Sequence, residues 1–272
     1  MKRSTFAVAA PPHYHTVPHV RPILALLLWT ALALQVSPVS AAAPLTDDIR
    51  IESRVLGYAL QYRVYVPDVP AGRTLPALYV TDGSLYLEHG RMQELLDEMI
   101  AAGRIEPLLV VFVDARDPDH PRTNRRNDQL ICKLDYARFF ATELVPAIDA
   151  TYPTRREPGS RTILGLSFGG LNAACFGLSI PGVFANLAMQ SPASSEMLDV
   201  VGEQYRKDER LQLRMFLSIG TRNDNTDAGR RFRRILEDKG YEVTFREVPY
   251  GHNWSNWKPL LPEVLETFFR PE

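Results

Sequence analysis

The sequence contains a serine, Ser167, with a glycine two residues before it and another two residues after it. Residues 161–166 predict a short buried strand, and the small residues from Gly169 onward predict a helix. A serine on the tight turn between them is typical of a nucleophile elbow, where the glycines remove Cβ atoms that would collide. An ordinary glycine-rich turn is the alternative. A hydroxyl held close to a helix N-terminus is suited to attack on an acyl carbon.

A serine nucleophile needs a base, and the sequence favours His252. The six histidines are His13, His15, His19, His89, His120 and His252. The first three lie in a predicted leader, while His89 and His120 are better explained as surface or substrate-side residues. His252 follows a predicted strand at 242–248, and the carboxyl end of a strand is where an open α/β sheet places its site. A solvent-exposed loop histidine is the alternative.

The acid that orients the histidine should follow the predicted strand 211–219, since α/β-hydrolases order the three residues as serine, acid and histidine. The exit loop of this strand contains Asp224 and Asp227. Asp224 is the preferred acid. Asp227 is the alternative, because Asp227 or its neighbour Thr226 can instead cap the helix that follows.

These residues predict acyl-transfer chemistry. Ser167 would attack the acyl carbon, His252 would take and return the proton, and the aspartate would fix the imidazole tautomer. The oxyanion needs two N–H donors, for which we expect the backbone of Phe168 and that of Ser84, after the predicted strand 75–80. A plain Asp-Gly turn is the alternative for the segment that contains Ser84.

The remaining chain predicts elements that would position these residues. Strand patterns cover 50–56, 59–66, 75–80, 108–113, 161–166, 185–190, 211–219 and 242–248. Helical patterns cover 92–102, 136–151, 170–178, 228–239 and 257–269. The first two strands alternate like an antiparallel pair at a sheet edge. The alternation of strands and helices predicts an α/β fold with a mostly parallel central sheet and helices on both faces, in a single domain.

The N-terminus predicts export. Residues 23–34 form an apolar run that follows three basic residues and precedes small residues at 39–43. We therefore expect a signal peptide with a long n-region at 1–42 and an enzyme domain at 43–272, in the periplasm or outside the cell. An uncleaved N-terminal anchor is the alternative. With signal cleavage we expect no stable membrane insertion, and the formal net charge of -1 gives no indication of nucleic-acid binding.

Several segments together resemble the esterase family of α/β-hydrolases that includes enterochelin (ferric enterobactin) esterases, with feruloyl and acetylxylan esterases, S-formylglutathione hydrolases and mycolyltransferases as more distant members. The resemblance rests on residues 165–170, 81–83, 220–221 and the His-x-Trp-x-x-Trp ending at 251–257. It spans roughly residues 50 to 270 and implies an α/β-hydrolase fold without a cofactor. Residues 126–132 also resemble a family segment that usually reads Arg-x-x-Glu-Leu, although Gln129 replaces the glutamate.

A long polar loop at 114–128 adds candidate substrate contacts. Its arginines are Arg116, Arg122, Arg125 and Arg126. Arginine matches oxyanions well, so the loop would hold an anionic ligand such as a catecholate iron complex, with Arg122, Arg126 and Trp254 as the contacts. The alternative is that acidic and basic residues of the loop neutralise one another.

Two cysteines, Cys132 and Cys175, permit one disulfide in an oxidising compartment. We expect Cys175 instead to pack as a small hydrophobic residue. No metal-ligand cluster lies outside the leader, so we expect neither a metal nor another cofactor.

The sequence thus predicts an exported serine esterase that acts on a small-molecule ester, first of all a siderophore trilactone. A feruloyl or acetylxylan type of carbohydrate esterase, or an acyltransferase, would use the same residues. A hydrolase-fold binding protein without turnover is the alternative of a different class.

Overall fold

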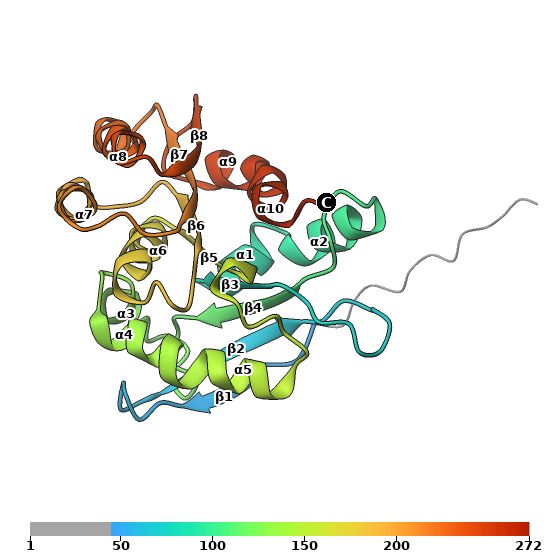
Figure 1. Cartoon of the computed structure of the whole chain (residues 1–272). Helices are drawn as coiled ribbons and strands as arrows, with labels where there is room; N and C mark the ends of the chain where they lie inside the picture. The colour runs from blue at the N-terminus through green and yellow to red at the C-terminus, as the bar shows by residue number, and fades with distance from the viewer. Residues whose placement is uncertain (1–44, 272) are drawn as a thin grey trace, which may run out of the picture. The chain divides into compact units, whose positions relative to one another are not determined.

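Eight strands form one sheet in the computed structural model, which describes residues 45–271. The predicted signal peptide, residues 1–42, lies outside the described residues. The strands (Figure 1) are β1 (Ile49–Glu52), β2 (Ala59–Tyr65), β3 (Ala77–Thr81), β4 (Leu109–Asp114), β5 (Arg161–Leu166), β6 (Asn186–Gln190), β7 (Arg214–Gly220) and β8 (Glu242–Val248). Each of the eight strands overlaps a strand that the sequence pattern predicts.

The strand order is β1-β2-β4-β3-β5-β6-β7-β8. Strand β2 runs antiparallel to β1 and β4, and the strands from β4 to β8 are parallel. The predicted antiparallel pair at the sheet edge and the predicted α/β-hydrolase fold are both confirmed. Because the parallel strands all end at one edge, the loops that follow β3, β5, β7 and β8 lie at the same side of the sheet.

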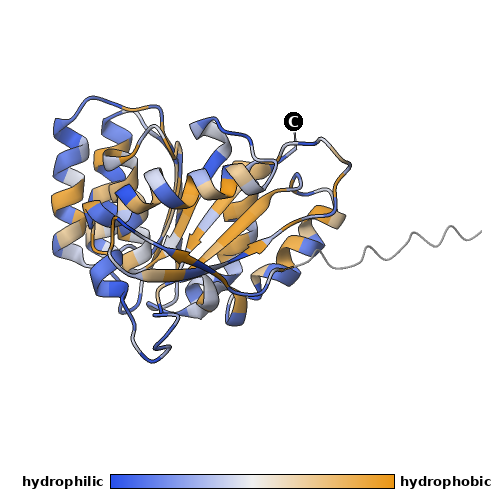
Figure 2. Ribbon diagram, turned by 90° about the horizontal axis from the view of Figure 1, so that it is seen from below, coloured by the Kyte–Doolittle hydropathy of each residue, from blue (hydrophilic) through white to orange (hydrophobic). Residues whose placement is uncertain are grey.

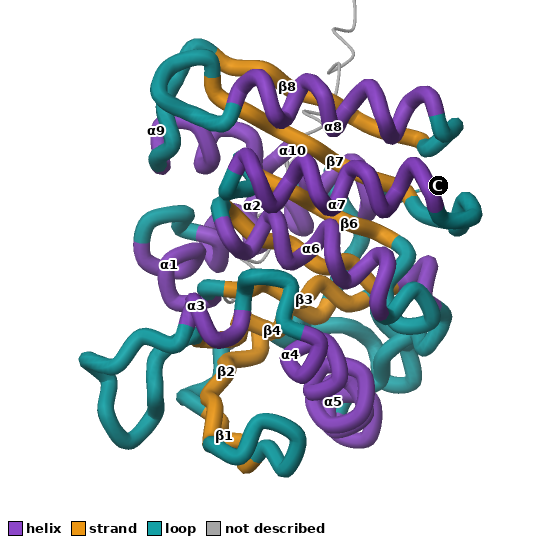
Figure 3. Tube along the Cα trace, turned by 90° about the vertical axis from the view of Figure 1, so that its left-hand side faces the viewer, coloured by secondary structure: helices purple, strands orange, loops and turns teal. Residues whose placement is uncertain are grey.

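Helices connect and cover the strands. The α-helices are α1 (Gly83–Glu88), α2 (Met92–Ala101), α3 (Arg126–Gln129), α4 (Leu134–Phe139), α5 (Val145–Thr151), α6 (Phe168–Ser179), α7 (Ser195–Lys207), α8 (Thr226–Asp238), α9 (Trp254–Trp257) and α10 (Leu261–Phe269). Shorter helical turns are η1 (Phe140–Leu144), η2 (Pro158–Ser160) and η3 (Lys258–Leu260). Seen from the side in Figure 3, α6, α7 and α8 lie in one layer over the strands.

The sheet has a hydrophobic core on each face, because alternate side chains of a strand point to opposite faces. In β3, Ala77 and Tyr79 belong to one buried cluster, while Leu78 and Val80 belong to the other. The first cluster packs against α4 to α8, and the second packs against α1, α2, α9 and α10. Figure 2 shows the consequence as mostly apolar strands flanked by helices that carry both polar and apolar residues.

Three helices lie where the sequence interpretation gave none: α1, α3 and α7. Helix α7 has a recognisable pattern, since Leu198, Val201 and Tyr205 are buried at helical spacing and Ser194 accepts a capping hydrogen bond from the Met197 N–H. The predicted helix 136–151 is interrupted by the π-helical turn η1. Pro146 follows this turn and lacks the N–H that a regular helix would use.

The expectation that Cys175 packs as a free hydrophobic residue is wrong, because Cys175 forms a disulfide with Cys132. The Cα atoms of the two residues are 5.5 Å apart, which is an ordinary separation for a disulfide. The bond joins the segment between α3 and α4 to the middle of α6.

Candidate active site

Ser167 lies at a strained turn between β5 and α6, with φ 56° and ψ −121°. Hydrogen bonds hold the turn on both sides, from the Ser167 N–H to the Gln190 carbonyl (2.9 Å) and from the Ala193 N–H to the Ser167 carbonyl (3.1 Å). A Cβ on Gly165 would lie 2.3 Å from the backbone carbonyl of Gly169. The strand and the helix therefore approach as closely as they do only because residue 165 is glycine.

His252 bridges Ser167 and Asp224, the three residues that the sequence analysis selected. The Ser167 hydroxyl donates to His252 Nε2 over 2.8 Å, and His252 Nδ1 donates to Asp224 Oδ1 over 2.8 Å. A carboxylate only accepts, so this arrangement fixes the proton on Nδ1 and leaves Nε2 as the acceptor for the hydroxyl. Ser167 follows β5, Asp224 follows β7 and His252 follows β8, so parallel strands that end at one edge of the sheet bring together residues far apart in the sequence.

The carboxylate of Asp224 is fully buried, and both oxygens accept hydrogen bonds. Oδ2 accepts from the Ser191 hydroxyl (2.6 Å) and from the Gly220 N–H (2.6 Å), while Oδ1 accepts from the Asn225 N–H (2.8 Å) as well as from His252. Burial alone would raise the pKa of Asp224, but these hydrogen bonds outweigh it and the pKa lies below its ordinary value. Asp224 is therefore ionised at neutral pH.

Ser191 connects Asp224 to the C-terminal segment. Its hydroxyl donates to Asp224 and accepts from the Trp257 indole N–H (2.9 Å) and from the Asn256 amide (3.1 Å). The Asn256 amide also lies 3.2 Å from Asp224 Oδ2, and the Trp257 ring packs edge to face against His252 at 5.1 Å between centroids. The His-x-Trp-x-x-Trp ending thus supports both the base and the acid.

The rival acid, Asp227, lies on the first turn of α8 with its side chain 85% exposed and pairs with Arg230. Thr226 is the first residue of α8. Asp224 is the aspartate of the two that contacts His252.

The two predicted N–H donors lie at the starts of helices that follow neighbouring strands. Phe168 is the first residue of α6, and Ser84 is the second residue of α1. N–H groups in the first turn of a helix have no acceptor within that helix. Strands β3 and β5 are paired, so both helix starts lie at the same edge of the sheet.

The arginines of the 114–128 loop mostly face acidic partners within the chain. Arg116 pairs with Asp114, Arg125 with Asp117, and Arg126 with Asp82. Arg122 is exposed, and the described contacts include no ion pair for it. The charges thus neutralise one another at three of the four arginines. Of the four loop arginines, Arg122 is the one for which the described residues provide no carboxylate partner.

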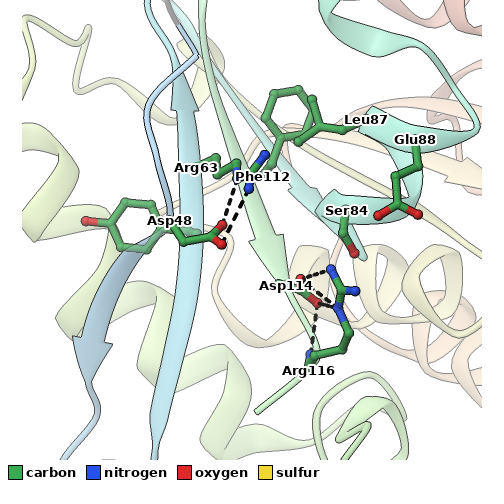
Figure 4. A pocket seen from close by; sticks show the side chains of 9 residues that line it. Asp48, Arg63, Ser84, Leu87, Glu88, Phe112, Asp114 and Arg116 are labelled. Atoms are coloured by element: carbon green, nitrogen blue, oxygen red, sulfur yellow. Dashed lines mark hydrogen bonds and ion pairs between the residues drawn. The ribbon is translucent and has the colours of Figure 1, made fainter. Parts of the chain in front are cut away.

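A small recess of about 80 Å³ lies beside Ser84 (Figure 4). Its walls include the Asp114–Arg116 pair and the Asp48–Arg63 pair, whose hydrogen bonds Figure 4 marks. The recess is polar and has room for a small group, next to a predicted oxyanion donor.

Trp254 lies half-buried two residues after His252. Its ring packs at 5.4 Å from that of Tyr86, 5.6 Å from that of Trp257 and 5.7 Å from that of His89. Tyr86 donates to Gln190, which in turn donates to the Trp257 carbonyl. Trp254 is therefore one member of an aromatic group that reaches His252 through Trp257.

Sequence reasoning missed several residues of this site: Ser191, Gln190, Asn256 and Asp82. Asn256 and Trp257 lie within the recognised C-terminal segment, and that position was a usable signal for Asn256. Ser191 had none, since a serine after a strand is common.

Among residues 45–271, no group of three or more His, Cys, Asp or Glu side chains could hold a metal ion. No helix in the same range is long and apolar enough to cross a bilayer.

Comparison with known proteins gives a consistent result. The model of a family described as "Putative esterase" matches residues 53–268, a range that contains Ser167, Asp224 and His252. The protein YjcH of Bacillus subtilis, described as uncharacterized, is 28% identical over 197 residues, or 68% of this chain and 80% of that protein. The iron(III) enterobactin esterase of Escherichia coli (strain K12) is 24% identical over 205 residues, or 72% of this chain and 50% of that protein.

Solved structures show the same fold. A crystal structure of the enterobactin esterase of Shigella flexneri in the presence of enterobactin matches with a TM-score of 0.74 at 22% identity. The match covers 83% of this chain and 58% of that chain. The chain thus spans about half the length of these two enterobactin esterases.

Proposed function

Because the chain belongs to this family of esterases, we propose that it hydrolyses carboxylic esters through an acyl-enzyme on Ser167. The observation that carries the proposal is the continuous row of hydrogen bonds from Ser167 through His252 to the buried Asp224. A binding protein would have no need of a serine at a strained turn with a base 2.8 Å from its hydroxyl.

In the proposed mechanism, the Ser167 oxygen bonds to the acyl carbon while its proton passes to His252 Nε2. Asp224 stabilises the imidazolium, and the N–H groups of Phe168 and Ser84 bind the oxyanion of the tetrahedral intermediate. The intermediate collapses as the C–O bond to the alcohol breaks, and His252 gives the proton to the departing oxygen. Water then repeats the sequence to release the acid and restore Ser167.

A siderophore trilactone is the substrate class that we propose first. The support is the similarity to enterobactin esterases and the aromatic group around Trp254, beside His252. Arg122 is the arginine of the loop with a guanidinium free for an anionic group on the substrate.

We also propose that the protein works outside the cytoplasm. The support is the apolar run at 23–34 together with the Cys132–Cys175 disulfide, since disulfides persist in oxidising compartments. Mass spectrometry of the protein from a periplasmic extract tests this proposal, because export with cleavage predicts a mature N-terminus close to residue 43.

The activity test compares the mature protein with Ser167→Ala on p-nitrophenyl acetate, methyl ferulate, and iron-loaded and iron-free enterobactin. Ser179→Ala is the matched control, since Ser179 is the last residue of the same helix. We expect Ser167→Ala alone to abolish turnover and labelling by a fluorophosphonate probe, with the trilactone as the fastest substrate. Faster turnover of methyl ferulate would refute the siderophore assignment, and absence of turnover and labelling in the wild type would refute the esterase.

A further inference from the structure

The guanidinium of Arg126 contacts both segments that carry the predicted oxyanion donors. Its Nε and Nη2 donate to the two carboxylate oxygens of Asp82 over 2.8 and 2.9 Å. Its Cζ also lies 5.6 Å from the centroid of the Phe168 ring. Asp82 precedes Gly83 and Ser84, and Phe168 follows Ser167. One side chain therefore bridges the turn after β3 and the turn after β5.

Asp82 has a conformation that requires support. Its φ is 55°, in the left-handed region, and its side chain is only 2% exposed. Burial raises the pKa of Asp82 above its ordinary value, and Arg126 opposes this shift through its charge and its paired hydrogen bonds. Gly83 comes next and packs so tightly that a Cβ there would lie 2.5 Å from the Phe112 backbone. The direction of the Ser84 N–H thus depends on where the Asp82 turn is held.

The segment that carries Arg126 is itself fixed to the body of the domain. The Arg125 N–H donates to the Ala115 carbonyl over 2.9 Å, and Cys132 is bonded to Cys175. Cys175 lies in α6, the helix that begins at Phe168. Arg126 is therefore positioned relative to the helix whose first N–H is the other oxyanion donor.

We propose that Arg126 is a positioning residue for the oxyanion hole. By holding the Asp82 carboxylate and packing on Phe168, it fixes the distance between the N–H groups of Ser84 and Phe168. This role rests on the proposed esterase mechanism, and it differs from direct contact with an anionic substrate, because the donors of Arg126 that face Asp82 are occupied within the protein.

The test measures Arg126→Gln and Arg126→Lys with p-nitrophenyl acetate and with a phenylboronic acid, which forms a tetrahedral adduct on the serine. Loss of an oxyanion donor costs about 10²- to 10³-fold in kcat. We expect Arg126→Gln to lower kcat by up to that factor, to change KM less than twofold and to weaken boronate binding in parallel with kcat. Arg126→Lys keeps the charge but loses the paired hydrogen bonds, so it should retain less than a tenth of the wild-type kcat.

A double variant separates positioning from stability. Arg126→Gln leaves Asp82 as a buried carboxylate without its partner, whereas Asp82→Asn combined with Arg126→Gln removes that charge as well. We expect the double variant to regain thermal stability without regaining kcat or boronate affinity. Arg231→Gln is the matched control, because it breaks a similar two-bond pair with Asp199 between α7 and α8. It should leave kcat and boronate affinity unchanged.

Wild-type kcat and boronate affinity in Arg126→Gln would overturn the inference while the esterase proposal stands. Recovery of kcat together with stability in the double variant would also overturn it, since Arg126 would then act on folding alone. A wild-type protein without hydrolysis or fluorophosphonate labelling would instead refute the proposed function, and the inference with it.

Discussion

Ser191→Ala tests how far the support of Asp224 contributes to stability and catalysis. The Ser191 hydroxyl makes three hydrogen bonds in a fully buried site, one of them 2.6 Å long to the Asp224 carboxylate. The neighbouring Ser218 is equally buried, and its carbonyl accepts from the Ser191 N–H, but its own hydroxyl has no partner among the described residues. Ser218→Ala is therefore a matched control that removes the same atom from the same region.

The hydrogen bonds of Ser191 give the expected losses in the free energy of unfolding and in kcat/KM. A hydrogen bond to a charged group contributes about 1.5–3 kcal/mol, and a buried donor left without an acceptor costs about 1–3 kcal/mol. Ser191→Ala should lower the free energy of unfolding by about 2–4 kcal/mol, whereas Ser218→Ala should change it by less than ~0.5 kcal/mol because no hydrogen bond is lost. His252 is charged in the transition state and depends on Asp224. If the full ~1.5–3 kcal/mol of the Ser191–Asp224 hydrogen bond is lost there, kcat/KM falls by about 10- to 150-fold.

The pH dependence provides a second measurement. The pKa of Asp224 lies below its ordinary value of 3.8, so its ionised form stabilises the folded state above that pH. This stability is lost as the pH falls through the folded-state pKa. Ser191→Ala removes a bond that lowers the pKa, so the part of the stability difference that depends on the ionised carboxylate should be complete at pH 5–7 and shrink below pH 3.8.

Urea denaturation from pH 3 to 7 and steady-state hydrolysis of p-nitrophenyl acetate measure these effects. Equal stability and equal kcat/KM in Ser191→Ala and Ser218→Ala would refute the reasoning, because it would mean that the hydrogen bonds of Ser191 contribute nothing. Loss of stability without any loss of kcat/KM would limit Ser191 to a structural role.

Three further predictions follow from the same geometry. Gly165→Ala should lower kcat by at least 10²-fold and the free energy of unfolding by about 1–3 kcal/mol, because the added Cβ collides with Gly169. Gly182→Ala, with open space around the residue, should change neither quantity. Equal kcat and equal melting temperature in the two variants would count against the tight turn at Ser167. Replacing both Cys132 and Cys175 by serine opens a link between residues 43 apart and should cost about 4 kcal/mol in urea denaturation on the chain-entropy account, a loss that an unchanged midpoint would contradict. Asp224→Asn should lower kcat about 10⁴-fold at pH 7 by favouring the wrong imidazole tautomer, and activity within tenfold of wild type would exclude this aspartate as the acid.

Much of the fold was predictable because its strands are strongly patterned. The parallel strands β3 to β7 are almost entirely buried, and such strands appear in sequence as continuous apolar runs. Helix α7 was missed although its buried residues follow helical spacing, because Gly202 in its interior and the apolar but exposed Val200 weaken the pattern. Helices α1 and α3 are too short for any periodicity to reveal them.

The residues of the candidate site that belong to a motif or follow a predicted strand could be predicted, whereas those defined by contacts across the fold could not. Ser167 lies in a motif, and His252 and Asp224 were selected by elimination and by their positions after strands. The ion pair between Arg126 and Asp82 and the hydrogen bonds of Ser191 depend on side-chain distances across residues 44 and 33 positions apart in the sequence. No local pattern encodes such distances. The prediction for Cys175 failed for the same reason, since one sequence does not give the separation of two cysteines.

The disulfide also determines what happens when the backbone is cut. Residues 156–157 lie in an exposed turn between Cys132 and Cys175, and a protease cleaving there would produce two fragments. Ser167, Asp224 and His252 would all remain on the C-terminal fragment, while Ser84 and Arg126 would lie on the other. The bond between the cysteines would keep the fragments in one covalent molecule, so nicked protein should migrate as a single species until a reductant is added.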